Sequence, residues 1–161
     1  MTRALEEIVW AVDPAHDSLD SIANYLGRFA QDFLSTADVS CRLDLPVQLP
    51  SQPISAEVRH NLFLAFKEAL NNVVRHAEAH EVNITLSVTE KDFVLSIADD
   101  GKGFSPAPAT SSVPTRGGHG LANIRARLAQ IGGEAEVSSV VGRGTQVRLS
   151  VPLPVGGAAG R

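Results

Sequence analysis

Asp99-Asp100-Gly101-Lys102-Gly103-Phe104 directly follows an apolar run over residues 93–98. The run is typical of a buried strand, and a carboxylate at its end, followed by two spaced glycines, suits a flat ligand. Such a carboxylate can accept a hydrogen bond from an exocyclic amine like that of adenine, and the glycines let the backbone approach the ligand. The same residues also fit an ordinary turn after a strand.

The composition is that of one soluble globular domain. The chain has 161 residues, of which 43% are hydrophobic and 20% are charged. A formal net charge of -4 argues against nucleic acid as a partner. Cys41 is the single cysteine, which excludes an internal disulfide and fits a reducing, cytoplasmic setting. No apolar run is long enough to span a membrane, so we expect no membrane insertion by this chain, which leaves a membrane-anchored parent open.

The apolar patterns predict an α+β fold. Apolar residues at helical spacing predict helices over residues 3–12, 17–36, 55–77 and 119–131. Alternating or apolar stretches predict strands near residues 40–45, 81–89, 92–99, 134–140 and 145–151. Residues 105–118 have no periodicity and contain prolines and paired glycines, which is typical of a functional loop such as a lid. Helices on one face of a mixed, largely antiparallel sheet would form an α+β sandwich.

The N-terminal helices carry an apolar stripe that needs a partner. In residues 17–36 its members are Leu19, Ile22, Ala23, Leu26, Ala30, Phe33 and Leu34. Standing alone, this helix would expose the stripe, which predicts a helical bundle or a dimer. His16-Asp17 has the composition of a phosphoacceptor pair, but it follows Pro14 at a helix start and is better interpreted as a capping turn.

The helix over residues 55–77 carries four polar side chains on neighbouring turns. The amide oxygen of Asn72 suits Mg²⁺, and Glu68 could orient or deprotonate a water or hydroxyl near that metal. Arg75 and His76 could donate hydrogen bonds to a phosphate chain. A solvated helix face is the alternative, although two consecutive asparagines in mid-helix count against it.

Two further motifs contain glycine. Gly118-His119-Gly120-Leu121 opens the helix over residues 119–131, where free backbone N–H groups and the helix dipole favour a phosphate. It is neither a Walker nor a Rossmann motif, and taken alone it also fits a flexible loop end. Gly144-Thr145 leads into the last strand. The Thr145 hydroxyl would lie near Asp99 if their strands are neighbours, and a tight turn is the alternative.

Read together in this order, the motifs resemble the catalytic ATP-binding domain of sensor histidine kinases. This domain belongs to the gyrase, Hsp90, histidine kinase and MutL ATPase superfamily. The Glu-x-x-x-Asn-x-x-x-His pattern of the helix is most similar to the nitrate-sensor and lipid-desaturase-regulator branch. The resemblance covers about residues 50–153 and implies a Bergerat-type two-layer sandwich, with a mixed sheet of about five strands under three helices. It also implies ATP and Mg²⁺ as cofactors.

The resemblance assigns roles to individual positions. Asn72 matches the asparagine that binds Mg²⁺, Glu68 the acidic position one turn before it, and Asp99 the aspartate that bonds the adenine amine. The remaining candidates for nucleotide binding are Arg75, His76, Gly101, Gly103, Phe104, Gly118, His119, Gly120, Leu121 and Thr145.

The resemblance also implies a division of the chain. Residues 1–37 are similar to the end of a dimerisation and phosphotransfer module, residues 38–154 would be the ATP-binding domain, and residues 155–161 a flexible tail. No phosphoacceptor histidine matches, so the γ-phosphate would go to a histidine elsewhere in the parent protein. A response regulator and a second copy, joined through the N-terminal helices, would be the parent's partners. An anti-sigma-type serine kinase and a non-catalytic, nucleotide-dependent interaction module are the alternatives.

Overall fold

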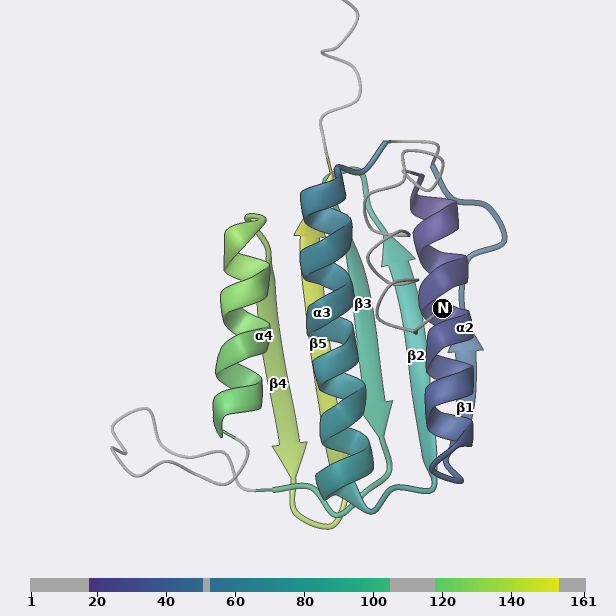
Figure 1. The fold of residues 1–161 in the computed structure, drawn as a ribbon, viewed down its shortest axis with the longest axis vertical. Helices are drawn as coiled ribbons and strands as arrows, with labels where there is room; N and C mark the ends of the chain where they lie inside the picture. The colour runs from purple at the N-terminus through teal and green to yellow at the C-terminus, as the bar shows by residue number, and fades with distance from the viewer. Residues whose placement is uncertain (1–17, 51–52, 105–117, 154–161) are drawn as a thin grey trace, which may run out of the picture.

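Within residues 18–50, 53–104 and 118–153, which the computed structural model describes, five strands form one mixed sheet with three helices on one face (Figure 1). The strands are β1 Ser40–Asp44, β2 Glu81–Val88, β3 Asp92–Asp99, β4 Glu134–Val140 and β5 Gly144–Pro152. Their order across the sheet is β1-β2-β3-β5-β4. Strand β1 is parallel to β2, and the other neighbours are antiparallel. The predicted α+β sandwich is confirmed.

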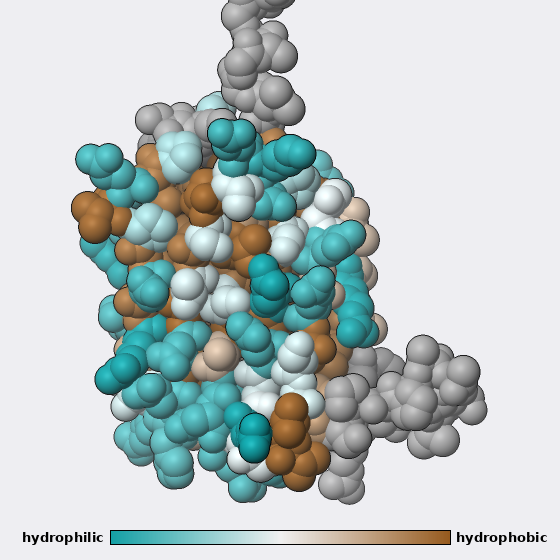
Figure 2. Space-filling view, turned by 180° about the vertical axis from the view of Figure 1, so that it is seen from behind, coloured by the Kyte–Doolittle hydropathy of each residue, from teal (hydrophilic) through white to brown (hydrophobic). Residues whose placement is uncertain are grey.

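The two faces of the sheet differ because side chains alternate along each strand. The inward side chains of the three central strands are buried under the helices, and they are Val82, Ile84, Leu86, Phe93, Leu95, Ile97, Val147, Leu149 and Val151. The opposite face carries exposed polar side chains such as Asn83, Gln146 and Arg148. Figure 2 shows the molecule from this side, where hydrophilic side chains cover much of the surface.

The three helices are α2 Leu19–Ser35, α3 Ala56–Asn72 and α4 Gly118–Gln130. Figure 1 shows α3 in the middle of the helical layer, between α2 and α4. The hydroxyl of Ser55 accepts a hydrogen bond from the N–H of Val58 at 3.2 Å, so Ser55 is the N-cap of α3. None of the helices in the described ranges is long and apolar enough to cross a membrane.

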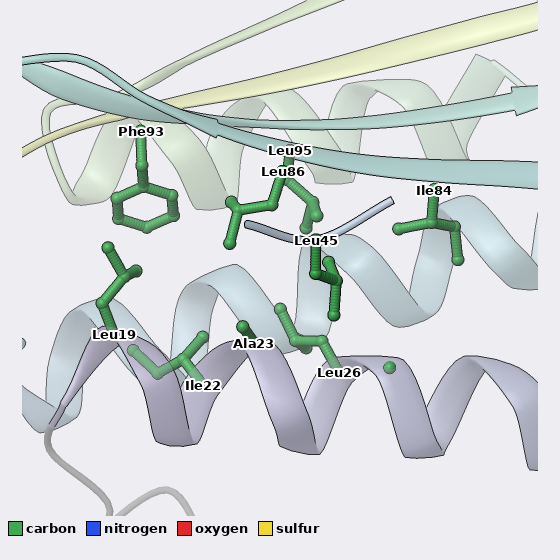
Figure 3. Close-up of a pocket in the computed structure, with 10 residues that line it drawn as sticks. Leu19, Ile22, Ala23, Leu26, Leu45, Ile84, Leu86, Phe93 and Leu95 are labelled. Carbon is green, nitrogen blue, oxygen red and sulfur yellow. The ribbon is translucent and has the colours of Figure 1, made fainter. Parts of the chain in front are cut away.

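Helix α2 covers part of the sheet. Leu19, Ile22 and Leu26 are at most 4% exposed and belong to the same core as β2 and β3. Figure 3 shows these side chains pointing across a small apolar gap toward the sheet and Leu45. The stripe that predicted a bundle or dimer partner is therefore covered by the chain's own sheet. The expected boundary at residue 37 does not coincide with a break in the core.

Helix α3 changes character where the predicted helix was expected to continue. After Asn72 the chain forms a π-helical turn, Val73–Ala77, and Glu78 then adopts a left-handed conformation with φ 53°. Such turns are rare and occur frequently at functional sites. The predicted helix over residues 3–12, the loop over residues 105–117 and the tail over residues 155–161 lie outside the described residues.

Candidate functional site

Four elements bring the sequence motifs together at one end of the sandwich. Strand β3 and helix α3 end there, and β5 and α4 begin there (Figure 1). The antiparallel pairing of β3 with β5 places Asp99, at the end of one strand, beside Thr145, near the start of the other. The strands of Asp99 and Thr145 are therefore neighbours, as the sequence-based interpretation of Thr145 required.

The carboxylate of Asp99 is held by two backbone donors. Its Oδ1 accepts hydrogen bonds from the N–H of Gly101 at 2.9 Å and from the N–H of Thr145 at 3.3 Å. Its Oδ2 makes no hydrogen bond to any described residue. The half-exposed side chain therefore presents one oriented oxygen atom as an acceptor.

Burial raises the pKa of the Asp99 carboxyl above its ordinary value. The two N–H donors from Gly101 and Thr145 lower this pKa, and the neighbouring charge of Asp100 adds to the increase. The raised pKa means that the ionised carboxylate is held in the fold at some cost to stability. Raised pKa values of this kind are frequent at functional sites.

Asp100 has a different function. Its Oδ1 accepts hydrogen bonds from the N–H groups of His80 at 2.8 Å and Glu81 at 3.0 Å. The Glu81 donor is the main cause that holds the pKa of Asp100 below its ordinary value, and the His80 N–H acts in the same direction. Asp100 therefore ties the end of β3 to the start of β2, a role that the sequence analysis did not assign.

Gly101 and Gly144 are required by close contacts within the protein. A Cβ atom on Gly101 would collide with the carbonyl oxygen of Ala77, which also accepts a 2.7 Å hydrogen bond from the N–H of Lys102. A Cβ atom on Gly144, whose φ is 96°, would collide with the carbonyl oxygen of Asp99. The expected approach of Gly101 and Gly103 to a ligand remains a prediction.

The start of α4 lies against the polar face of α3. A Cβ atom on Gly120 would lie 2.7 Å from Oε1 of Glu68 and 3.0 Å from Oδ1 of Asn72. Glu68 and Asn72 are half-buried, and an oxygen atom of each side chain reaches the start of α4. Leu121, the next residue, packs against the hydrophobic core.

The other predicted site residues make fewer contacts with Asp99, Glu68 and Asn72. Arg75 and His76 are exposed on the π-helical turn and form no ion pair with a described residue. Phe104 is 38% exposed, and its N–H donates to Oγ of Ser139 at 2.8 Å. Gly118 and His119 form the first turn of α4.

The donor set fits Mg²⁺ only in a partly solvated form. In the described part of the chain, no group of three or more His, Cys, Asp or Glu side chains could hold a metal ion. Asn72 and Glu68 supply oxygen donors, and Mg²⁺ usually completes its octahedral shell with water and phosphate oxygens. The residues present are thus suited to a metal that arrives with a phosphate chain.

Ser139 is a second residue that the sequence analysis missed. It lies on the same, inward face of β4 as Ala135 and Val137, and it is half-buried. Its Oγ lies 2.8 Å from Oγ1 of Thr145. A polar residue at an apolar position of an alternating strand was the signal that could have identified it.

Comparisons of the sequence point to one group of proteins. A family model described as "Histidine kinase-, DNA gyrase B-, and HSP90-like ATPase" matches residues 57–155. Sensor histidine kinase LiaS of Bacillus subtilis is 36% identical over 111 residues, which are 69% of this chain and 29% of LiaS. An uncharacterised sensor-like histidine kinase of Chloroflexus aurantiacus is 35% identical over 101 residues, which are 62% of this chain and 17% of that protein. The chain thus spans less than a third of either relative.

A solved structure has the same fold. The histidine kinase domain of the blue-light activated histidine kinase from Erythrobacter litoralis EL346 superposes with a TM-score of 0.66. The two are 21% identical, and the match covers 95% of this chain and 76% of that one.

Proposed function

Because the chain belongs to the histidine kinase-, DNA gyrase B- and HSP90-like ATPase family, we propose that it binds Mg²⁺-ATP as the catalytic part of a sensor histidine kinase. The γ-phosphate then passes to a histidine elsewhere in the parent protein. The observation that carries the proposal is the oriented carboxylate of Asp99, at the same end of the sandwich as Glu68 and Asn72.

Asp99 selects the base in this proposal. Its Oδ1 is already occupied by the N–H groups of Gly101 and Thr145, so its Oδ2 has a fixed direction before any ligand arrives. The exocyclic amine of adenine donates to this oxygen atom, whereas the carbonyl at the same place in guanine meets it as a second acceptor. A buried acceptor left without a donor is unfavourable, which gives the site a preference for ATP over GTP.

The phosphate chain lies toward α3 and the start of α4. Asn72 would hold Mg²⁺ through its amide oxygen, and the bound ion would neutralise charge on the phosphates during transfer. Glu68, beside Asn72, would orient a water molecule there. The backbone N–H groups at the start of α4 and the exposed Arg75 and His76 would donate to phosphate oxygens.

The parent protein supplies the remaining groups. A nitrogen of its phosphoacceptor histidine forms the new bond to the γ-phosphorus atom, the bond to the bridging oxygen breaks, and ADP leaves. In this proposal a response regulator then receives the phosphoryl group, and the parent acts as a homodimer.

Calorimetric titration of ATP and GTP into the wild-type chain and its Asp99→Asn variant tests the assignment of the base. The amide retains an acceptor for Gly101 and Thr145 but can replace the free carboxylate oxygen by a donor. We expect ATP affinity to fall at least about tenfold. The melting temperature should stay equal or rise, because the variant removes a carboxylate whose pKa is raised in the fold.

Two outcomes contradict the proposal. Wild-type ATP affinity in Asp99→Asn would refute the role of this carboxylate. Phosphate transfer is tested with radiolabelled ATP, the chain, and a separate polypeptide carrying the parent's phosphoacceptor histidine. If the chain binds ATP but transfers no phosphate to that polypeptide, it is a binding module rather than a kinase domain.

A further inference from the structure

The hydroxyl of Ser139 joins two segments at the edge of the candidate site. Its Oγ accepts a 2.8 Å hydrogen bond from the N–H of Phe104 and lies 2.8 Å from Oγ1 of Thr145. It also lies 3.3 Å from the carbonyl oxygen of Gly144. These contacts connect β4 with the start of β5 and with the residue that ends the Asp99–Phe104 motif.

Thr145 extends this network to the carboxylate. Its N–H donates to Oδ1 of Asp99, while its hydroxyl faces Ser139. The hydrogen bond to Asp99 comes from the backbone N–H of Thr145, and the predicted position of its hydroxyl near Asp99 stays a prediction. A single hydrogen-bonded chain thus runs from Phe104 through Ser139 and Thr145 to Asp99.

The donors and acceptors around Ser139 limit the hydrogen bonds that the Thr145 hydroxyl can form. A serine hydroxyl has one proton and two lone pairs, and the N–H of Phe104 occupies one lone pair. If the Ser139 hydroxyl donates to the carbonyl oxygen of Gly144, the Thr145 hydroxyl must donate to Ser139. The Thr145 hydroxyl can then only accept a hydrogen bond from a ligand. If Ser139 donates to Thr145, the proton of Thr145 is left for another group. In both arrangements the Thr145 hydroxyl is hydrogen-bonded to Ser139, which limits the directions that its proton can take.

We propose that Ser139 is a positioning residue for base recognition, which acts by orienting the Thr145 hydroxyl and the backbone at Phe104. This inference rests on the proposed function, because it assigns Ser139 a part in the same nucleotide site. Ser139 itself lies behind Thr145, relative to Asp99, and acts through it. Losing the network should therefore weaken recognition of the base more than recognition of the phosphates.

The test compares Ser139→Ala with Ser138→Ala in the full chain. Ser138 precedes Ser139 on β4 and is exposed on the opposite face. Its side chain forms no hydrogen bond with Thr145 or Phe104, so it is the matched control. In Ser139→Ala we expect ATP affinity to fall about tenfold and GTP affinity less than about twofold, by calorimetry. Ser138→Ala should leave both affinities unchanged, and Ser139→Thr, which keeps the hydroxyl, should restore most of the ATP affinity.

Two further measurements separate positioning from a general loss of stability. In the nucleotide-free chain, amide exchange at Phe104 should be faster in Ser139→Ala than in Ser138→Ala. In a double-mutant cycle with Thr145→Val, the Ser139→Ala effect on ATP affinity should largely disappear. Additive effects would overturn the inference, as would equal losses of ATP and GTP affinity. If the wild-type chain binds no ATP, the proposed function and this inference both fail; if it binds ATP and Ser139→Ala binds equally well, only the inference fails.

Discussion

At the scale of single residues, the pKa values of two adjacent aspartates are shifted in opposite directions. Burial raises the pKa of Asp99, whereas the N–H of Glu81 lowers the pKa of Asp100. The ionised form of Asp99 costs stability and leaves an oxygen atom for a ligand. The ionised form of Asp100 stabilises the fold by joining two strand ends. The sequence predicted the first role from the position at the end of a strand, but the second depends on where β2 starts.

Asp100→Ala tests this structural role through its pH dependence. Because the folded-state pKa is lowered, the stabilisation is present above the unfolded-state pKa of about 3.9 and is lost as the pH falls through the folded-state pKa. We expect the variant to lose about 1 kcal/mol of unfolding free energy at neutral pH. Urea denaturation at a series of pH values should show the difference from wild type shrinking below about pH 4.

Asp44→Ala is the matched control for this measurement. Asp44 is exposed on β1, and its side chain forms no hydrogen bond or ion pair with a described residue. Its replacement should change the unfolding free energy little at any pH. A difference between wild type and Asp100→Ala that stays constant down to acidic pH would contradict the role given to the Asp100 carboxylate.

At the scale of elements, the junction between α3 and α4 leaves little room for an added atom. Gly120 lies where a side chain would press on Glu68 and Asn72. The sequence predicted both helices and their polar residues, because helical periodicity is local. It did not predict that the first turn of one helix touches these side chains, since that contact depends on how two helices cross.

Gly120→Ala tests this junction. The new Cβ atom would lie within 3.1 Å of three side-chain atoms of Glu68 and Asn72, which would have to shift. We expect affinity for Mg²⁺-ATP to fall about tenfold, while affinity for adenosine stays near wild type, because the base contacts lie at Asp99. The melting temperature should not fall, since Ala favours a helix over Gly.

Ala122→Ser, an exposed change two residues further along α4, is the control and should leave both affinities unchanged. Equal losses for Mg²⁺-ATP and adenosine in Gly120→Ala would indicate a general disturbance of the pocket. They would refute a specific role of Glu68 and Asn72 toward metal and phosphate.

At the scale of the whole molecule, α2 belongs to the core of the sandwich. Its large apolar side chains Leu19, Ile22, Leu26 and Leu34 are almost fully buried. Each contributes about 1.5–3 kcal/mol by burial. Together they are comparable with the typical total stability of a domain, about 5–15 kcal/mol.

A chain that begins at residue 38 should therefore fail to fold. Removing α2 would expose the inward side chains of β2, and we expect loss of a cooperative thermal transition and a tendency to aggregate. Circular dichroism and size-exclusion chromatography measure both effects. A chain that ends at residue 154 is the control, and it should melt like the full chain. Cooperative folding of the chain that begins at residue 38 would contradict this expectation and support the boundary that the sequence predicts.

The spacing of residues along the chain predicts the strands, the helices and the motifs of the site, because each depends on residues that are close together in the sequence. Alternation located β3 and β5, and the order of Asn72, Asp99, Gly120 and Thr145 along the chain was sufficient for the resemblance to a kinase family. Two features are seen only in the tertiary structure: the sheet covers α2, and the N–H groups of Gly101 and Thr145 donate to Asp99. Those features depend on the strand order β1-β2-β3-β5-β4, which joins residues far apart in the chain. The contacts of Ser139 depend on the same strand order, because its partners Phe104 and Thr145 lie on other segments.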